Sequence, residues 1–389
     1  MKRVGVGIIG TGTIAEQHVT AIEHLGGLGV LIAACDANPA RLTRFGERHF
    51  FPFACQDPSD LLDRKDVDLV IVATPPSTHE TLTSLALQHG KHVVCEKPLA
   101  HHLAAADRIH ALASEHLGKL SVCYQMRFDH NFKRIHWLLQ QPAFGRVHEI
   151  ECRRCSPAPP RAISKGWWGK WDVAGGGTMM TQLIHNLDLV CHLLGRPEWV
   201  EAKMSNTTPG LESEDTCKAK VRFSNQIDFR SYCSLHGDPS DNFFRIHGDF
   251  GTLELPWERT HLKPYLRVLA AEALDKFPGP SGESRFRNLL RRATNKGFRK
   301  IRSRIQIPGP HVRNSHFPYL KAILEAIKQS QPLPLGPEET RMSMELVTAI
   351  YAAAIDRERK YFPIPLEHAY YRGGIKSHWT AMHTSKLSA

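Results

Sequence analysis

The chain begins with Arg3-Val4-Gly5-Val6-Gly7-Ile8-Ile9-Gly10-Thr11-Gly12-Thr13-Ile14-Ala15-Glu16. The apolar run over residues 4–9 predicts a buried strand, the Gly10–Gly12 segment a tight turn, and the following residues a helix. A Gly-x-Gly-x-x-Ala motif between a strand and a helix is typical of dinucleotide-binding folds. Gly10 permits the turn, Gly12 lets the backbone approach a pyrophosphate, and Ala15 lets the helix pack closely on the strand. The free N–H groups and positive dipole of the helix N-terminus can then bind phosphate.

An acidic residue follows the second predicted strand. The apolar run over residues 30–35 is followed by Asp36, about 20 residues beyond the glycines, where a carboxylate accepts hydrogen bonds from ribose hydroxyls. The same carboxylate would repel a 2′-phosphate, so we expect NAD rather than NADP. Arg41 and Arg44 are close enough in sequence to soften that preference. An Asp that only caps the strand is the alternative.

The composition is that of an ordinary globular protein, with 389 residues, 42% of them hydrophobic and 23% charged. This length predicts two domains. No apolar run approaches the ~20 residues of a membrane span, and the first strand begins at residue 4, which leaves no room for a signal peptide. Nine cysteines are scattered, and the one close pair, Cys152 and Cys155, lies in a predicted strand where residues three apart face opposite sides. We interpret them as unrelated thiols and expect a cytoplasmic protein.

Strand and helix patterns alternate up to residue 124, which predicts a doubly wound parallel sheet of Rossmann type over residues 1–124. Further strands are expected at 68–73, 92–96 and 120–124, and helices at 58–64, 79–88 and 103–116. Ligands of such sheets bind at the carboxyl ends of the strands. Gly10, Asp36, Thr74 and Lys97 all follow predicted strands, so one crevice can collect all four.

Beyond residue 124 strands predominate, which predicts an α+β domain over residues 125–365 with a large, mainly antiparallel, open-faced sheet. Its strands are expected at 147–153, 199–206, 215–223, 226–235 and 243–255, and its helices at 131–140, 315–329 and 338–357. Residues 366–389 are expected to form an irregular tail.

The net charge of +11 is concentrated in residues 285–304, which contain nine Lys or Arg and no acid. The apolar residues of this segment recur at helical spacing, which predicts a basic amphipathic helix. It is either a solvated helix on the second domain or a contact for an anion such as a membrane surface or an acidic sugar polymer. Nucleic acid is the least favoured partner, because aromatic residues are few and no nucleic-acid motif is present.

Several motifs together resemble the Gfo/Idh/MocA oxidoreductase family, which includes glucose–fructose oxidoreductase and inositol dehydrogenase. They are Gly10-Thr-Gly-Thr-Ile-Ala15, Ala73-Thr-Pro-Pro-Ser-Thr-His79, Glu96-Lys-Pro98, Gly175-Gly-Gly177 leading to His185, Phe250-Gly-Thr-Leu-Glu254, and Ala349-Ile-Tyr351. The resemblance covers most of residues 1–365. It implies an NAD(P) site formed by Gly10, Gly12, Thr13, Ile14, Asp36, Arg41, Thr74, Pro75, His79, Glu96, Lys97 and Gln125.

Lys97 is the best candidate for acid/base chemistry in the crevice. An ammonium group in a partly dry crevice can lose pKa by desolvation and then exchange a proton with a substrate hydroxyl. A surface Lys that begins a helix is the alternative. His185 follows three glycines, expected to form an adaptable loop, in a helical pattern that puts Thr181 and His185 on one face. A His packed in the domain core is the alternative for His185.

The resemblance assigns the hydroxyl chemistry to a Lys, an Asp and a His, but here Thr181 stands in place of the Asp and Leu183 in place of a glycine. Thr181 can hydrogen-bond a hydroxyl but cannot take its proton at neutral pH, so the proton falls to Lys97 and His185. Asp188 is a candidate for orienting the imidazole, with a structural role in its helix as the alternative.

Three tryptophans lie in Trp167-Trp168-Gly169-Lys170-Trp171, which resembles a Trp-Arg-Gly-x-Trp stretch of sugar-acting family members. Indole faces suit the C–H face of a sugar ring, so Trp168 and Trp171 are candidate substrate contacts, with a core role as the alternative. Gln125 and Arg127 match family positions near the nicotinamide or the substrate. We find neither His-Glu-x-x-His nor paired Cys spacing, and expect no metal.

The resemblance implies an NAD(P)-dependent oxidoreductase that acts on a secondary hydroxyl of a sugar, sugar nucleotide or cyclitol, and a homo-oligomer formed through the second domain's sheet. Two alternatives stay open. One is a redox-assisted glycosidase or lyase that retains its NAD, and the other is a non-catalytic NAD-binding sensor or scaffold.

Overall fold

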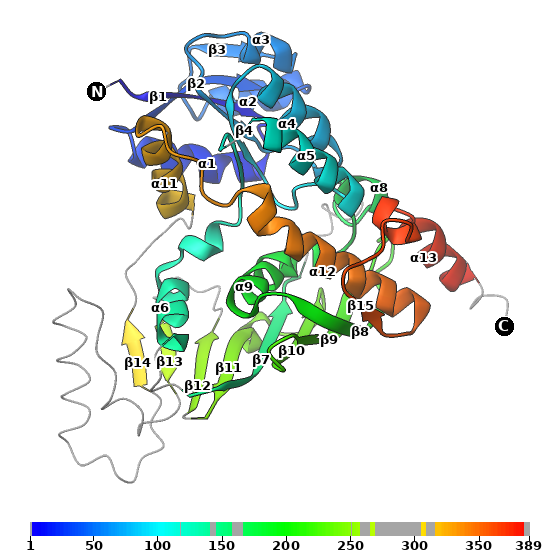
Figure 1. Cartoon of the computed structure of the whole chain (residues 1–389). Helices are drawn as coiled ribbons and strands as arrows, with labels where there is room; N and C mark the ends of the chain where they lie inside the picture. Colours follow the sequence, from blue (N-terminus) through cyan, green and yellow to red (C-terminus); the bar gives the residue numbers. More distant parts are fainter. Residues whose placement is uncertain are drawn as a thin grey trace, which may run out of the picture.

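The computed structural model describes residues 2–116, 118–140, 145–157, 166–249, 251–256, 265–268, 305–308 and 316–384. The basic segment 285–304 lies outside these residues. Two sheets organise the chain, and Figure 1 shows them at opposite ends of the molecule with the long helix α12 (Pro337–Asp356) between them.

The first sheet has six strands in the order β3-β2-β1-β4-β5-β6, and all its pairings are parallel. Its strands are β1 (Val4–Ile9), β2 (Gly29–Cys35), β3 (Phe53–Cys55), β4 (Leu69–Val72), β5 (His92–Cys95) and β6 (Leu120–Val122). β1 and β4 are buried at every position, as expected for strands covered on both faces. The predicted doubly wound parallel sheet is confirmed.

Helices connect these strands. They are α1 (Thr13–His24), α2 (Pro39–Gly46), α3 (Pro58–Leu62), α4 (His79–Gln88) and α5 (Leu103–Glu115). The side chain of Asn38 caps α2, that of Asp57 caps α3, and a proline occupies the first turn of each helix. Strand β3 and helix α2 were absent from the sequence-based prediction, because both are short and only weakly apolar.

The second sheet has nine strands in the order β14-β13-β12-β11-β7-β10-β9-β8-β15. They are β7 (Val147–Cys155), β8 (Pro197–Ser205), β9 (Thr216–Phe223), β10 (Asp228–Ser234), β11 (Phe243–Gly248), β12 (Gly251–Pro256), β13 (Tyr265–Val268), β14 (Ile305–Pro308) and β15 (Lys360–Tyr361). β7 and β10 pair in parallel and the other neighbours antiparallel, which confirms the mainly antiparallel sheet.

Two local predictions for this half of the chain were wrong, and one predicted helix has an unusual first turn. The single strand expected over residues 243–255 is a hairpin of β11 and β12, whose turn interrupts an otherwise continuous β-type pattern. The helix expected after the glycines is confirmed, although it starts as a π-helical turn (Met179–Leu183) before it continues as α9 (Ile184–Leu194). The irregular tail instead contains helix α13 (Ile375–Thr384), which packs near α8 (Trp171–Ala174) and α12 through the buried Trp379.

Two further helices connect the sheets. After β6 the chain passes through the short turn Gln125–Phe128 and α6 (His130–Leu139) into the second sheet. It returns through α11 (His316–Lys328), which packs against α1 and β1 of the first sheet. Figure 1 shows α11 beside α1, so a segment from late in the chain covers the dinucleotide-binding half.

Candidate active site

A cleft of about 560 Å³ opens at the carboxyl ends of the parallel strands. It is lined by residues that follow β1, β2, β4 and β5 and by two segments that come after the parallel sheet, residues 167–168 and 181–182. Among its lining residues are Gly10, Gly12, Thr13, Ile14, Asp36, Arg41, Thr74, Pro75, Glu96, Lys97, Trp167, Trp168, Thr181 and Gln182. The expected meeting of Gly10, Asp36, Thr74 and Lys97 in one crevice is therefore observed.

The glycine turn forms a cradle at one end of the cleft. Gly10 has a φ of 93°, and a Cβ there would lie 2.7 Å from the carbonyl oxygen of Ala73, so a side chain is excluded. A Cβ at Gly12 would instead meet nothing within 4 Å, because it would point into open space. Gly12 is also the N-cap of α1, with no side-chain cap on the first N–H groups. The turn thus leaves room and free donors for a diphosphate, so these residues fit NAD.

Asp36 is buried beside this cradle and is held by four donors. Its carboxylate accepts hydrogen bonds from the N–H and the hydroxyl of Thr11, both at 2.9 Å, from the N–H of Asn38 at 2.8 Å, and from Arg41. Burial acts to raise the pKa of Asp36, but these hydrogen bonds lower it below the usual value. Arg41 is half exposed, so a ribose hydroxyl can displace its guanidinium from the carboxylate.

Lys97 lies where the two halves of the chain meet. Its Nζ donates to the backbone oxygen of Thr181 at 3.0 Å, which links the end of β5 to the π-helical turn. Burial lowers the pKa of Lys97 below its ordinary value, and the charge of Arg154 acts in the same direction while Glu96 opposes it. The structure therefore places Lys97 in the cleft and not on a free surface.

His185 lies close to Lys97 but does not line the cleft among the described residues. Burial and the Lys97 charge lower the pKa of His185 well below its usual value, so the imidazole is neutral at neutral pH. Its ring stacks edge-on to Tyr124 with centroids 6.0 Å apart. The hydroxyl of Thr181 donates to the oxygen of Gly177 at 2.6 Å and keeps its acceptor capacity.

The three glycines before Thr181 do not form the adaptable loop that was expected. They are buried, and a Cβ on Gly176 would lie 2.1 Å from the Tyr351 hydroxyl, while one on Gly177 would lie 1.9 Å from the Glu214 backbone oxygen. The glycines are required by close packing.

Glu214, which the sequence-based prediction missed, holds this segment. Its buried carboxylate accepts from the N–H groups of Gly177 and Met179, both at 2.9 Å, and from the Tyr351 hydroxyl at 3.0 Å. Burial raises its pKa to about 7. The run Glu212-Ser-Glu-Asp215 is entirely polar, and no local signal in the sequence marks Glu214 as buried.

The three tryptophans have different environments. Trp167 is 42% exposed, and both Trp167 and Trp168 line the cleft. Trp171 is 4% exposed and packs against Tyr351 and Trp379 at ring-centroid distances of 5.1 and 5.9 Å. The substrate contact predicted at Trp171 stays a prediction, and in this structure the side chain packs in the core, which is the alternative given above.

Arg127 and Asp188 form an ion pair. The guanidinium of Arg127 donates to both carboxylate oxygens of Asp188, at 2.7 and 2.6 Å, and also to the backbone oxygen of Glu339. Both side chains are buried. The roles predicted for Arg127 in substrate binding and for Asp188 in orienting His185 stay predictions. In this structure the pair ties α9 to α12.

His79 and Gln125, which are predicted to bind the cofactor, are both buried in this structure. His79 is fully buried, and its ring nitrogens lie 2.8 Å from the backbone oxygens of Thr74 and Pro98, so it joins two cleft-forming turns from behind. Gln125 is buried and accepts from the Cys123 thiol. Neither residue is among the described residues that line the cleft.

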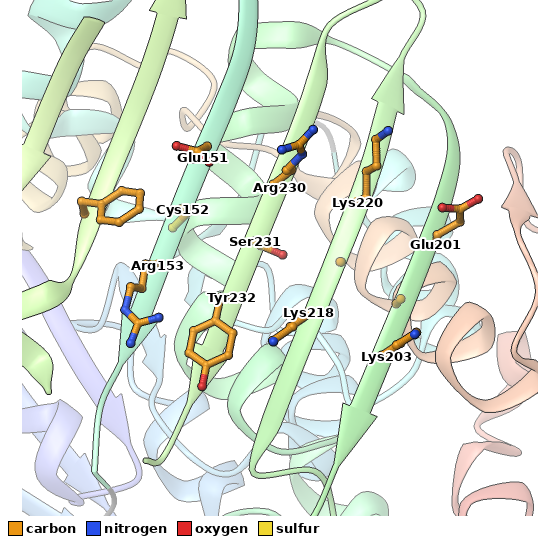
Figure 2. Close-up of a pocket in the computed structure, with 13 residues that line it drawn as sticks. Glu151, Cys152, Arg153, Glu201, Lys203, Lys218, Lys220, Arg230, Ser231 and Tyr232 are labelled. Carbon is orange, nitrogen blue, oxygen red and sulfur yellow. The ribbon is translucent and has the colours of Figure 1, made fainter. Parts of the chain in front are cut away.

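A second hollow of about 660 Å³ lies on the open face of the nine-stranded sheet. Figure 2 shows its side chains rising from neighbouring strands, with Arg153, Lys203, Lys218, Lys220 and Arg230 among them. Arg153 and Lys218 lie over the ring of Tyr232, at 4.7 and 5.4 Å from its centroid. We call this surface the open sheet face.

The fold and the cleft define a dinucleotide-binding protein of the Rossmann type. Residues 4–124 match the family model described as "Oxidoreductase family, NAD-binding Rossmann fold". Residues 132–254 match the model "GFO/IDH/MocA C-terminal domain". The chain belongs to the Gfo/Idh/MocA family, as its motifs suggested, and its first domain is an NAD-binding domain.

Relatives of known name support this membership. The chain is 28% identical to the myo-inositol 2-dehydrogenase of Thermotoga maritima over 225 residues, which is 56% of this chain and 64% of the relative. The first three curated relatives are matched over 54%, 64% and 52% of their own lengths, so the chain spans about half to two thirds of each.

Two solved structures share the fold over most of their length. The WlbA dehydrogenase of Bordetella pertussis, in complex with NADH and UDP-GlcNAcA, superposes with a TM-score of 0.77 at 23% identity, covering 94% of this chain and 99% of that one. The aldose–aldose oxidoreductase of Caulobacter crescentus superposes with a TM-score of 0.75 at 22% identity, covering 93% and 100%.

Proposed function

We propose that the protein is an NAD-dependent oxidoreductase acting on a secondary hydroxyl, or the matching ketone, of a sugar, sugar nucleotide or cyclitol. The observation that carries this proposal is the position of Lys97, which projects into the same cleft as the glycine cradle and Asp36. Bound NAD would supply the hydride acceptor or donor. The side chains of this chain bind the substrate and move the hydroxyl proton.

Lys97 is the proposed acid/base. Because burial lowers its pKa, a larger fraction of its amine is neutral at a given pH than in an exposed lysine. The neutral amine can take the proton of a carbinol hydroxyl as the hydride leaves, and the ammonium can return it in the reverse direction.

His185 and Thr181 are proposed to assist. The neutral imidazole of His185 can accept a hydrogen bond or relay a proton, but at neutral pH it has no positive charge that could stabilise a substrate anion. The Thr181 hydroxyl retains an acceptor site for a substrate hydroxyl. Thr181 can thus position a substrate hydroxyl as the family Asp would, but it cannot take over proton transfer.

We propose NAD in preference to NADP because Asp36 is ionised and buried beside the cradle. A 2′-phosphate next to this carboxylate would meet a like charge in a poorly solvated site. The Arg41 guanidinium, paired with Asp36, reduces this preference without removing it.

The proposed substrate class rests on the cleft wall and on the relatives. Trp167 and Trp168 offer aromatic faces for a polyhydroxylated ring. The relatives named above are an inositol dehydrogenase, an aldose–aldose oxidoreductase and a dehydrogenase crystallised with a nucleotide sugar. A cyclitol, a free sugar and a sugar nucleotide are therefore the compounds to test.

The first experiment releases any nucleotide from the purified protein by denaturation, identifies it, and measures the affinities for added NAD and NADP. NADH formation is then followed with myo-inositol, glucose, levoglucosan and UDP-GlcNAcA. Exchangeable NAD that is reduced by one of these compounds supports the proposal. Retained NAD without net reduction supports a redox-assisted glycosidase or lyase instead, and no binding of either nucleotide overturns the proposal.

We also propose that the protein forms a homo-oligomer through the open sheet face. The face is broad and combines an aromatic side chain with charges of both signs, as self-complementary surfaces do. Among the helices of the described residues, none has the length and apolar character needed to cross a membrane.

A further inference from the structure

Four side chains with metal-binding atoms converge below the turn that carries Lys97. They are His18 of α1, Glu96 after β5, Cys123 after β6, and His316, the first residue of α11. One ligand atom from each lies within 4.8 Å of the other three, and all four residues are buried. We call this set the His18 cluster.

Two donor-atom distances of the cluster can be compared with those of a metal centre, and the shorter one is a hydrogen bond between His18 and Glu96. His18 Nε2 lies 2.7 Å and His316 Nε2 3.6 Å from the same oxygen, Glu96 Oε1. The two imidazole rings approach edge to face with centroids 4.7 Å apart. Zn–N bonds of about 2.0 Å and Zn–S bonds of about 2.3 Å put neighbouring donor atoms roughly 3.3–3.6 Å apart in a tetrahedron. The His316–Glu96 distance already matches, and the His18–Glu96 distance must lengthen by less than about 1 Å.

The donor types select the metal. Two imidazoles, one carboxylate and one thiol are the ligands that Zn²⁺ uses, whereas Mg²⁺ and Ca²⁺ require oxygen ligands. Four protein ligands in a buried position make a closed, structural site with no position for substrate. The Cys123 thiol would lose its proton on binding the ion, and the divalent charge would then balance the thiolate and the Glu96 carboxylate.

We propose that the His18 cluster binds one zinc ion that fastens α11 to the dinucleotide-binding domain. His316 is the only member from the late part of the chain, and the helix it begins packs along α1. Glu96 immediately precedes Lys97, so the ion would also fix the turn that carries the proposed acid/base. No sequence motif revealed this set because its four members come from four separate elements.

The test uses full-length, tag-free protein produced in zinc-supplemented medium and passed through metal-free buffer. Mass spectrometry of the metal content is expected to give about one zinc per chain. Cys123→Ser and His316→Gln are each expected to reduce zinc at least tenfold. The matched control is Cys95→Ser, which changes a buried cysteine at the end of β5 that is outside the cluster and should retain the zinc.

A second measurement does not depend on variants folding well. Wild-type protein reconstituted with Co²⁺ should show the visible bands of a tetrahedral site and a thiolate-to-cobalt charge-transfer band, and folded Cys123→Ser should lose the latter. Less than about a tenth of an equivalent of zinc in the wild type, with no cobalt bands, overturns the proposal. Zinc retained in both cluster variants also overturns it, because the metal must then lie elsewhere. NAD affinity measured on the same samples tests the proposed function separately.

Discussion

The nucleotide cleft and the hollow on the open sheet face have similar volumes, about 560 and 660 Å³, but their polar groups differ in burial. The cleft contains an uncapped helix N-terminus, an open space at Gly12 and a lysine whose pKa is lowered by burial. On the sheet face the charged side chains are at least partly exposed and some of them form ion pairs, as Arg230 does with Glu149 at 2.8 Å and Lys220 with Asp228 at 3.4 Å.

This difference shows that volume alone does not identify a reactive site. Exposed ion pairs are worth little energetically and are screened by water. A group whose pKa is shifted by burial, placed beside unused donors, can do chemistry. The following predictions test whether the cleft and the sheet face are as different in function as they are in structure.

The largest effect is expected for Lys97→Met. Loss of the acid/base should lower kcat about 10²- to 10⁴-fold, with NAD affinity changed by less than about threefold. The assay is steady-state NAD reduction with the substrate found in the screen described above. Lys218→Met on the sheet face is the matched control and should keep the wild-type kcat. A Lys97→Met enzyme within tenfold of wild type would contradict the assigned role.

Gly12→Val should weaken NAD binding about 10- to 100-fold, because a side chain there fills the space beside the helix N-terminus. The fold should be retained, since a Cβ at Gly12 meets nothing within 4 Å. Gly27→Val, also in open space but away from the cleft, is the control. Calorimetric titration with NAD measures both. Equal affinities in the two variants would show that NAD does not bind at the cradle.

The pH profile sharpens the assignment of Lys97. In the oxidation direction the base must be neutral, so kcat/KM should rise about tenfold per pH unit and level off above the pKa of Lys97. Because burial lowers that pKa, the plateau should begin below 10.5, the ordinary lysine value. If kcat/KM keeps rising to pH 10.5 or beyond, or if the rise persists in Lys97→Met, the pH dependence reports the titration of another group.

Asp36→Asn should shift the NAD-to-NADP preference about tenfold toward NADP, since it removes the charge that opposes a 2′-phosphate. Competition binding of the two nucleotides measures the ratio. Asp238→Asn removes an exposed carboxylate that caps a short turn in the second domain, and should leave the ratio unchanged. An unchanged ratio in Asp36→Asn would mean that Asp36 only caps its strand.

The smallest effect on the cleft is expected for Lys218→Glu. NAD affinity should stay within about twofold of wild type, while light scattering should show a lower oligomeric mass, because charge reversal disturbs a self-complementary face. Lys65→Glu, at an exposed position of the first domain, is the control for the added charge. An unchanged mass in Lys218→Glu would place the subunit contact elsewhere.

Much of the nucleotide cleft could be predicted from sequence, because its parts follow strands with clear local patterns. Gly10, Asp36, Thr74 and Lys97 each come directly after such a strand, and parallel topology brings strand ends together. The sequence is less informative where a side chain has several possible partners. Trp171 and Asp188 have residue types that suit a substrate site, but in this structure Trp171 packs against Tyr351 and Asp188 binds Arg127.

Local patterns in the chain predict the Rossmann half, since its strands, helices and glycine turn each follow from a short stretch of sequence. Contacts between distant segments appear only in the tertiary structure. They include the hydrogen bond from Lys97 to Thr181, the support of the glycine segment by Glu214, and the convergence of the His18 cluster. Such contacts depend on how α11, α12 and the two sheets pack together, and no periodicity in sequence encodes which side chains then meet.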